Sequence, residues 1–268
     1  MTRAFIDLQH VTVAFPQSHN IHRALDDLTF SVAKGEWLGV IGRNGSGKST
    51  LARVIAGICP VSKGNAEIRL APVQMVFQNP EAQLVGETVY EEVCFGMEVQ
   101  AIDPALMPSR AHQALTRVGL GVPVNEPVSR LSGGQKQLLN LASCLAVDAQ
   151  VLVFDEATSM LDPLSRERVL AIARDLYLSG HTIVWITQWM EELAYVDRVL
   201  VLEDGRMVHT GGREDFFYRG EEGSTACERL GFPLPYAVRV AHRLIAQGHA
   251  LPFLPVSTQQ LAEAVANS

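Results

Sequence analysis

The chain has 268 residues, of which 47% are hydrophobic and 19% charged, and its 22 lysines and arginines stand against 29 aspartates and glutamates. The formal charge of −7 argues against a protein that coats nucleic acid, because phosphate binding favours a basic surface. The hydrophobic fraction provides a sizeable core, in one large domain or one large domain plus a small one, and argues against intrinsic disorder.

The sequence shows no sign of export or membrane insertion. Its apolar runs are shorter than the roughly 18 residues that a spanning helix needs, and the start MTRAFIDLQH lacks the apolar stretch and cleavage site of a secretory signal. The four cysteines are scattered without a CxxC pair, so we expect buried thiols rather than disulfides or zinc ligands. These features predict a cytosolic chain.

Short apolar runs open the chain in the pattern of β-strands. FIDLQHVTVAF (5–15) and ALDDLTFSVAKGEWLGVIG (24–42) are predicted strands with turn residues between them. The second run leads into a glycine-rich loop, and KSTLARVIAG (48–57) has the spacing of a short helix that ends at glycine. Strand, loop and helix together predict the opening of an α/β unit.

The rest of the chain divides into three regions. Between about 80 and 148 the strand signal disappears, which predicts a mostly helical insertion. Further apolar runs alternate with helical stretches such as 165–180, and this alternation predicts a largely parallel sheet covered by helices. The segment 216–268 is too short for a full domain and too apolar for a linker, so we expect a helical appendage. The predicted later strands are 73–77, 151–154, 182–186 and 198–202.

The strongest motif is GRNGSGKST, which satisfies G-x-x-x-x-G-K-[ST] between a predicted strand and a predicted helix. Its glycines let the backbone wrap around phosphate oxygens, with the amides and the helix N-terminus pointing inward. Lys48 is expected to reach the β- and γ-phosphates, and the Ser49 hydroxyl to take one position on Mg²⁺. The alternative is a chance glycine turn. The candidate nucleotide-binding residues are Gly42, Asn44, Gly45, Ser46, Gly47, Lys48, Ser49 and Thr50.

Two carboxylates follow the apolar run 151–154. Asp155 suits Mg²⁺ binding, directly or through water, and Glu156 suits polarising an attacking water. An apolar run that ends in two acids is weak evidence by itself, since it also fits an ordinary strand end. With a phosphate loop on the same predicted sheet, the functional interpretation is favoured.

LSGGQ, Leu131 to Gln135, makes a family resemblance specific. A phosphate loop alone leaves kinases and GTPases open, whereas LSGGQ ahead of residues 151–156 resembles the signature of ABC ATPases. Ser132 and the amides of Gly133 and Gly134 are expected at a helix start, where they can bind a γ-phosphate. The resemblance, which also covers Gln135, implies that the nucleotide is ATP and that each signature binds the phosphate held by the opposite subunit of a dimer.

Other positions carry family roles by resemblance. Gln78 resembles the Q-loop glutamine that contacts Mg²⁺ and the water. Phe15 matches the aromatic residue that stacks on adenine, with a plain core residue as the alternative. Asp162 ends a D-loop, 159–162, that crosses the dimer interface in the family. Gln188 stands where the family usually has histidine, and its neutral amide donates a weaker hydrogen bond to a γ-phosphate, which predicts slow hydrolysis. The alternative is that Gln188 is fully competent.

The stretch QNPEAQLVGETVYEEVCFG (78–96) narrows the resemblance to the ATPases of energy-coupling-factor (ECF) importers, which carry vitamins or cobalt and nickel ions. EATSMLDP, TQWMEEL, ERLGFPLPYAVRVAHRL and HALPFLP are similar to the same branch, so the resemblance covers essentially the whole chain. It implies a P-loop NTPase fold of the ABC type: a nucleotide-binding domain over 1–215, with the insertion at about 80–148, and a C-terminal helical extension over 216–268 that contacts the partner ATPase.

The resemblance also implies partners and a location. These are a second ABC ATPase in a homodimer or heterodimer, a transmembrane coupling subunit and a substrate-binding membrane subunit, without nucleic acid, at the cytoplasmic face of the cell membrane. Gln83, Leu84 and Glu91 are candidates for the contact with the coupling subunit, with ordinary surface or packing residues as the alternative. Three other functions stay open: the ATPase of a classical binding-protein-dependent ABC importer, a soluble ABC ATPase, and a regulatory subunit that binds ATP without turnover.

Overall fold

The computed structural model describes residues 4–17, 20–69, 72–221 and 224–267. Its main sheet has six strands in the order β5-β6-β7-β3-β8-β9, all parallel except for β9, which runs antiparallel to β8. This arrangement confirms the predicted α/β fold with a largely parallel sheet. The strands are β3 (Trp37–Gly42), β5 (Val73–Val76), β6 (Val151–Asp155), β7 (Thr182–Ile186), β8 (Arg198–Glu203) and β9 (Arg206–Gly212).

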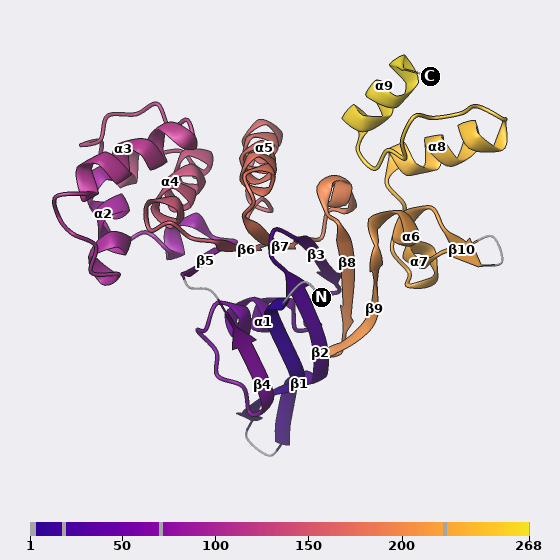
Figure 1. Cartoon of the computed structure of the whole chain (residues 1–268), viewed down its shortest axis with the longest axis horizontal. Helices are drawn as coiled ribbons and strands as arrows, with labels where there is room; N and C mark the ends of the chain where they lie inside the picture. Colours follow the sequence, from indigo (N-terminus) through magenta and orange to yellow (C-terminus); the bar gives the residue numbers. More distant parts are fainter. Residues whose placement is uncertain (1–3, 18–19, 70–71, 222–223, 268) are drawn as a thin grey trace.

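A second sheet, antiparallel and three-stranded, lies below the first in Figure 1. It has the order β2-β1-β4, with β1 at Ala4–Gln17, β2 at Asn20–Ala33 and β4 at Lys63–Ile68. Helix α1 (Lys48–Ile55) shares one hydrophobic cluster with both sheets, because its buried residues Leu51, Val54 and Ile55 point into it. The phosphate loop is thereby fixed between a strand of the main sheet and a packed helix.

The predicted helical insertion is present at one end of the main sheet, at the left in Figure 1. Its main helix, α4 (Gly133–Ala146), buries eight residues, and its apolar side chains belong to a second hydrophobic cluster on the other face of the sheet. Helix α5 (Pro163–Leu178) contributes to the same cluster. The other elements of the insertion are η1 (Pro80–Ala82), α2 (Val89–Val99), α3 (Met107–Arg117) and η2 (Val128–Arg130).

The C-terminal segment lies at the opposite end of the main sheet (Figure 1). Phe216, Phe217 and Val238 are fully buried in the same cluster as the main sheet, so this segment shares its core with the rest of the chain. Its last helix donates a hydrogen bond from Gln260 Nε2 to Ala194 O at 3.0 Å. The elements are α6 (Arg213–Phe217), β10 (Gly220–Glu221), β11 (Ser224–Thr225), α7 (Ala226–Arg229), α8 (Tyr236–Ala246) and α9 (Thr258–Ala266).

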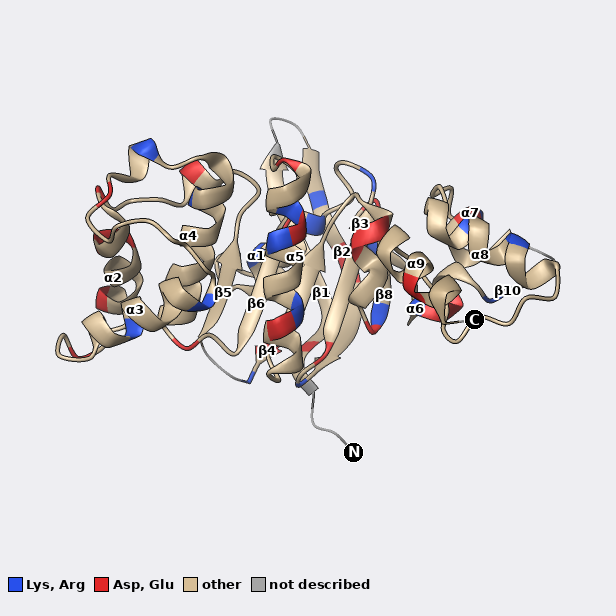
Figure 2. Ribbon diagram, turned by 90° about the horizontal axis from the view of Figure 1, so that it is seen from above, with Lys and Arg blue, Asp and Glu red and all other residues tan. Residues whose placement is uncertain are grey.

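The cysteines, the helix lengths and the charge distribution can be compared with what the sequence predicts. Cys94, Cys144 and Cys227 are buried and Cys59 is half-buried, and all four are free thiols. In the described ranges no helix is long and apolar enough to cross a bilayer. Figure 2 shows lysines and arginines interleaved with acidic residues, most clearly along α5.

Candidate nucleotide-binding site

The phosphate loop connects β3 to α1 and requires glycine at two places. Gly47, the residue before α1, has a φ of +100°, and a Cβ there would lie 2.4 Å from the carbonyl oxygen of Ala24. A Cβ on Gly42 would lie 2.3 Å from the carbonyl oxygen of Leu202. The loop backbone is therefore packed against neighbouring strands, and its turn geometry is one that only glycine adopts without strain.

Lys48 is buried at the base of this loop, with 5% of its surface exposed. Its ammonium group donates hydrogen bonds to the carbonyl oxygens of Gly42 (2.8 Å) and Arg43 (3.1 Å) and lies 3.7 Å from Glu156 Oε1. Burial lowers the pKa of Lys48, and the Glu156 and Asp155 carboxylates oppose that shift. A cation held among backbone carbonyls at a helix N-terminus can bind phosphate.

The two carboxylates predicted at a strand end lie beside this lysine. Asp155 ends β6 and accepts a hydrogen bond from Ser49 Oγ at 3.0 Å. Burial raises the pKa of Asp155, and the Ser49 hydrogen bond opposes that rise. Glu156 follows with a φ of +50°, a left-handed conformation that few non-glycine residues adopt, and it is only 8% exposed. Such backbone strain is concentrated at functional sites.

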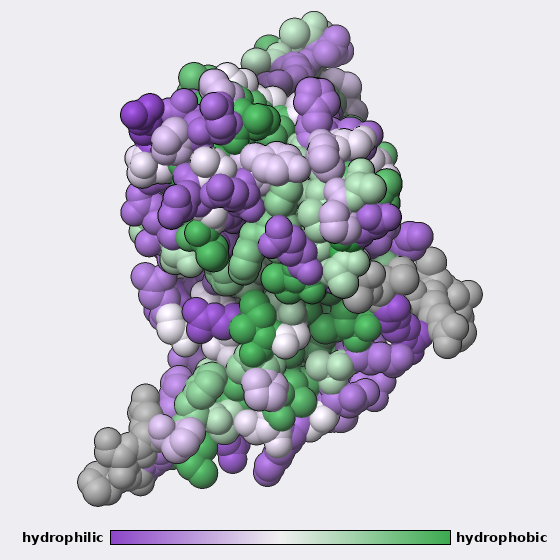
Figure 3. Space-filling model, turned by 90° about the vertical axis from the view of Figure 1, so that its left-hand side faces the viewer, coloured by the Kyte–Doolittle hydropathy of each residue, from purple (hydrophilic) through white to green (hydrophobic). Residues whose placement is uncertain are grey.

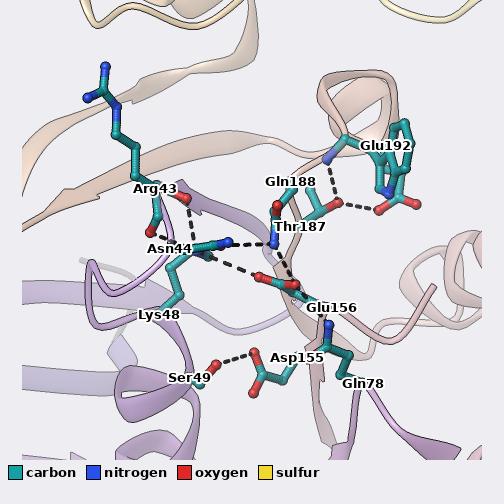
Figure 4. Close-up of polar contacts among 12 residues, drawn as sticks. Arg43, Asn44, Lys48, Ser49, Gln78, Asp155, Glu156, Thr187, Gln188 and Glu192 are labelled. Carbon is teal, nitrogen blue, oxygen red and sulfur yellow. Dashed lines mark hydrogen bonds and ion pairs between the residues drawn. The ribbon is translucent and has the colours of Figure 1, made fainter. Parts of the chain in front are cut away.

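Two amide side chains converge on the Glu156 carboxylate (Figure 4). Gln78 Nε2, from the loop after β5, is 3.3 Å from Glu156 Oε2. Gln188 Nε2, from the loop after β7, is 2.7 Å from the same oxygen and 3.2 Å from Asn44 Oδ1 of the phosphate loop. The structure thus brings Asn44, Gln78, Glu156 and Gln188 into one hydrogen-bonded cluster at the carboxyl ends of parallel strands, and Lys48 joins it through its ion pair with Glu156.

Other predicted site residues do not join this cluster through a hydrogen bond. Phe15 lies on β1 opposite His22 of β2 and is 44% exposed, so it has an open ring rather than a core position. The Ser46 hydroxyl is buried and has no hydrogen-bond partner among the described residues, so its hydrogen-bonding capacity is left unsatisfied. Gly45 and Thr50 lie in the loop and in the first turn of α1.

The signature motif lies elsewhere in the chain. Ser132 caps α4 in a reciprocal pair with Gln135. The backbone amide of Gln135 donates to the Ser132 hydroxyl, and the backbone amide of Ser132 donates to the side-chain oxygen of Gln135. A Cβ on Gly134 would lie 2.2 Å from Ser165 Oγ, at the start of α5, where Asp162 is the cap. Among the described residues, no hydrogen bond or ion pair links the signature residues 132–135 to the phosphate-loop residues 42–50. Gly133 of the signature is exposed.

The candidates for contact with a membrane subunit have different environments. Gln83 points inward, because its amide donates to Met75 O at 2.9 Å and accepts from Phe77 N at 3.3 Å. Glu91 caps α2 together with Thr88. Leu84 lines a groove of about 520 Å³ with Glu81, Gly86, Glu87, Thr88, Pro127, Val128, Ser129 and Lys136. Figure 3 shows the end of the molecule that carries the insertion, where some apolar side chains reach the surface. The exposed apolar residues of α2 and the loops around it include Val85, Phe95 and Val99.

One buried acid beside the cluster was missed by the sequence reasoning. Glu192 is 2% exposed and accepts hydrogen bonds from three side chains. The sequence shows it as the second of two adjacent glutamates, Glu191 and Glu192, without indicating which one is buried.

Comparisons with known proteins agree with these features. The family described as ABC transporter matches residues 25–159. The energy-coupling factor transporter ATP-binding protein EcfA1 of Lacticaseibacillus paracasei is 37% identical over 92% of this chain and 91% of its own length, and that of Levilactobacillus brevis is 38% identical over 98% and 95%.

Two solved structures resemble the chain. The structure of cbiO1 from Clostridium perfringens, part of the ABC transporter complex cbiONQ, has a TM-score of 0.73 and 26% identity over 92% of this chain and 98% of that one. The dimeric structure of the ATP-binding cassette MJ0796, in a post-hydrolysis state bound to ADP and Pi, has a TM-score of 0.71 and 24% identity. The match covers 78% of this chain and 98% of that one, and it shows a shared fold alone.

Proposed function

Since the chain belongs to the ABC transporter family, in the branch of energy-coupling factor ATP-binding proteins, we propose that it binds and hydrolyses ATP to energise an ECF-type importer of a vitamin or a transition-metal ion. The observation that carries the chemistry is the cluster of Lys48, Glu156, Gln78 and Gln188 at the mouth of the phosphate loop. Lys48 and the N-terminus of α1 would bind the β- and γ-phosphates.

The oxygen donors near Lys48 fit Mg²⁺. Ser49 Oγ and Asp155 Oδ1 lie 3.0 Å apart, and Gln78, whose Nε2 donates to Glu156 Oε2 at 3.3 Å, carries a further amide oxygen. In the described residues no three His, Cys, Asp or Glu side chains gather as a metal site. That is compatible with Mg²⁺, which is held through one or two carboxylates, waters and substrate phosphates. When bound, the ion would neutralise charge on the phosphate oxygens.

The protein's own part in hydrolysis follows from Glu156 and its neighbours. Its carboxylate would accept a hydrogen bond from the attacking water and orient it toward the γ-phosphate. The Gln188 amide, which is 2.7 Å from that carboxylate, would donate to the γ-phosphate or hold Glu156 in place. Phe15, with its exposed ring, would stack on the adenine.

The separation of the signature from the phosphate loop supports a dimer. Ser132 caps α4, and Ser132 and Gly133 are exposed, while Gly134 packs toward Ser165 of α5 rather than toward residues 42–50. We therefore propose that a second ABC ATPase, identical or related, brings its phosphate loop to this signature, with Asp162 near the shared interface. The C-terminal segment 216–268, where Tyr236 is 60% and Ile245 44% exposed, adds to the contact between the two ATPases.

Replacing Ser132 by arginine tests the shared site. We expect the ATPase rate of the assembled complex to fall at least about tenfold, because a bulky cation at this helix start blocks approach of the partner's nucleotide. ATP binding to this chain's own phosphate loop should be unchanged. The matched control is Ser109→Arg, on the exposed face of α3; an equal loss of rate in both variants would contradict the shared site.

Replacing Gln188 by histidine is expected to raise the hydrolysis rate severalfold. A protonated imidazole donates a charge-assisted hydrogen bond, which is stronger than that of a neutral amide by about 1 kcal/mol. Steady-state ATPase assays of the two proteins at saturating ATP measure the change. An unchanged or lower rate would show that Gln188, bonded to both Glu156 and Asn44, is already fully competent.

The groove lined by Leu84, Glu81 and Lys136 supports docking of a transmembrane coupling subunit. The groove lies next to the loop that carries Gln78. A movement of a subunit bound in the groove can therefore shift Gln78 and change its contact with Glu156. We propose that the chain attaches there to the cytoplasmic face of the membrane, while a separate membrane subunit binds the transported substrate.

Single-turnover hydrolysis tests the enzymatic function. With the complex in excess over labelled ATP, we expect conversion to ADP and phosphate within one binding cycle, even if turnover is slow. Bound ATP that stays intact would contradict the proposal and favour a subunit that binds ATP without hydrolysis.

A further inference from the structure

Glu192 is a buried acid whose carboxylate connects two loops of the site. It lies on η3 (Met190–Tyr195) and is 2% exposed. Thr158 Oγ1 donates to Oε1 at 2.6 Å, while Trp185 Nε1 at 3.0 Å and Thr187 Oγ1 at 2.5 Å donate to Oε2. Arg166 Nε of α5 is 3.8 Å from Oε1.

The donors belong to the segments that carry the reacting side chains. Thr158 is two residues after Glu156, and Thr187 immediately precedes Gln188. Thr187 Oγ1 also accepts a hydrogen bond from the amide of Trp189 at 3.0 Å, so the backbone on both sides of Gln188 is tied to the same carboxylate. Figure 4 shows Thr187 and Glu192 next to the cluster around Glu156.

From this geometry we propose that Glu192 is a positioning residue for ATP hydrolysis, an inference that rests on the proposed function. It clamps the segment after β6 to the segment after β7 and so keeps Glu156 Oε2 and Gln188 Nε2 at 2.7 Å. Both of its oxygens are occupied by donors of this chain and its side chain is enclosed, so it does not touch the nucleotide. It acts through Gln188 and Glu156.

A second acid provides a matched control. Glu36 accepts hydrogen bonds from the amide of Ala33 at 2.7 Å and from Arg198 Nε at 2.8 Å, and its side chain is 13% exposed. It precedes β3, at the end of the strand away from the phosphate loop. Glu36→Gln therefore removes a hydrogen-bonded, largely enclosed carboxylate without touching the site.

The kinetic test compares Glu192→Gln with Glu36→Gln in the assembled complex. We expect kcat to fall about tenfold in Glu192→Gln with KM for ATP within about twofold, because only the alignment of the hydrolytic groups is lost. Glu192→Asp should recover part of the rate. Equal kcat in Glu192→Gln and the wild type would overturn the proposal.

A double variant shows whether Glu192 acts through Gln188. Once Gln188→Ala has removed the aligned amide, adding Glu192→Gln should lower kcat by less than about twofold, since residues that act as a unit are not additive. A full further tenfold loss would contradict action through Gln188, because it would place the effect of Glu192 outside the Gln188 contact.

Hydrogen exchange of the nucleotide-free protein provides a readout that does not depend on hydrolysis. In Glu192→Gln the peptides covering 156–161 and 187–190 should exchange at least about tenfold faster, while those from α2 stay unchanged. Unchanged exchange in both site peptides would refute the clamp. A wild type without ATPase activity would refute the proposed function, and the exchange result would still decide whether the clamp exists.

Discussion

Replacing Glu156 by glutamine is expected to lower the ATP hydrolysis rate by at least about a hundredfold while ATP still binds. The carboxylate is the general base in the proposed site, and a positioned base contributes about a hundredfold to ten-thousandfold. The substitution keeps the shape of the side chain, so the contacts with Gln78 and Gln188 lose only their charge-assisted character. Steady-state and single-turnover ATPase assays measure the loss, and equilibrium binding of labelled ATP measures affinity.

The control for this variant is Glu167→Gln, an exposed acid on α5. It should leave the rate within about twofold of the wild type. A Glu156→Gln protein that binds ATP and keeps more than about a tenth of the rate would contradict the assignment of Glu156 as the base, since a single-turnover assay excludes effects of product release.

Replacing Lys48 by alanine should weaken ATP binding by about a hundredfold, or roughly 2.7 kcal/mol. The ammonium group is the buried cation of the phosphate loop, 3.7 Å from Glu156. Its removal takes away the positive charge that would contact the phosphates and leaves the enclosed Glu156 carboxylate without its ion-pair partner. Calorimetry with a slowly hydrolysed ATP analogue measures the affinity.

Lys34→Ala removes an exposed lysine from the turn before β3 and is the matched control. We expect its affinity to equal that of the wild type. Thermal unfolding of both variants separates a lost contact from a lost fold, and an unaltered affinity in a folded Lys48→Ala protein would contradict the placement of the phosphates at this loop.

The main sheet could be predicted because its strands are buried on both faces and appear as continuous apolar runs. Residues 151–154 and 182–186 illustrate this, since every one of them is buried. Two edge strands were not predicted. β4, with the sequence KGNAEI, and β9, with RMVHTGG, contain no buried residue, and neither contains the apolar run from which a strand is recognised. The separate antiparallel sheet was missed together with β4.

The candidate site residues that belong to one short sequence motif could be predicted from the sequence. The spacing of glycines and Lys48 fixes the phosphate loop, and the pair Asp155-Glu156 follows a buried strand. Contacts between distant segments could not be predicted in the same way. The approach of Gln188 to Asn44 and the burial of Glu192 depend on how the loops after two strands pack together. The inward turn of Gln83 depends on the position of the Met75 carbonyl, to which its amide donates.

Purification of the tagged chain from detergent-solubilised membranes of its native host tests the central claim most directly, with stoichiometric partners identified by mass spectrometry. The account predicts recovery with a transmembrane coupling subunit, a small substrate-binding membrane protein and a second copy of this chain or a related ATPase. Recovery from the soluble fraction alone, without a membrane partner, would contradict a role in an ECF-type importer and favour a soluble ABC ATPase.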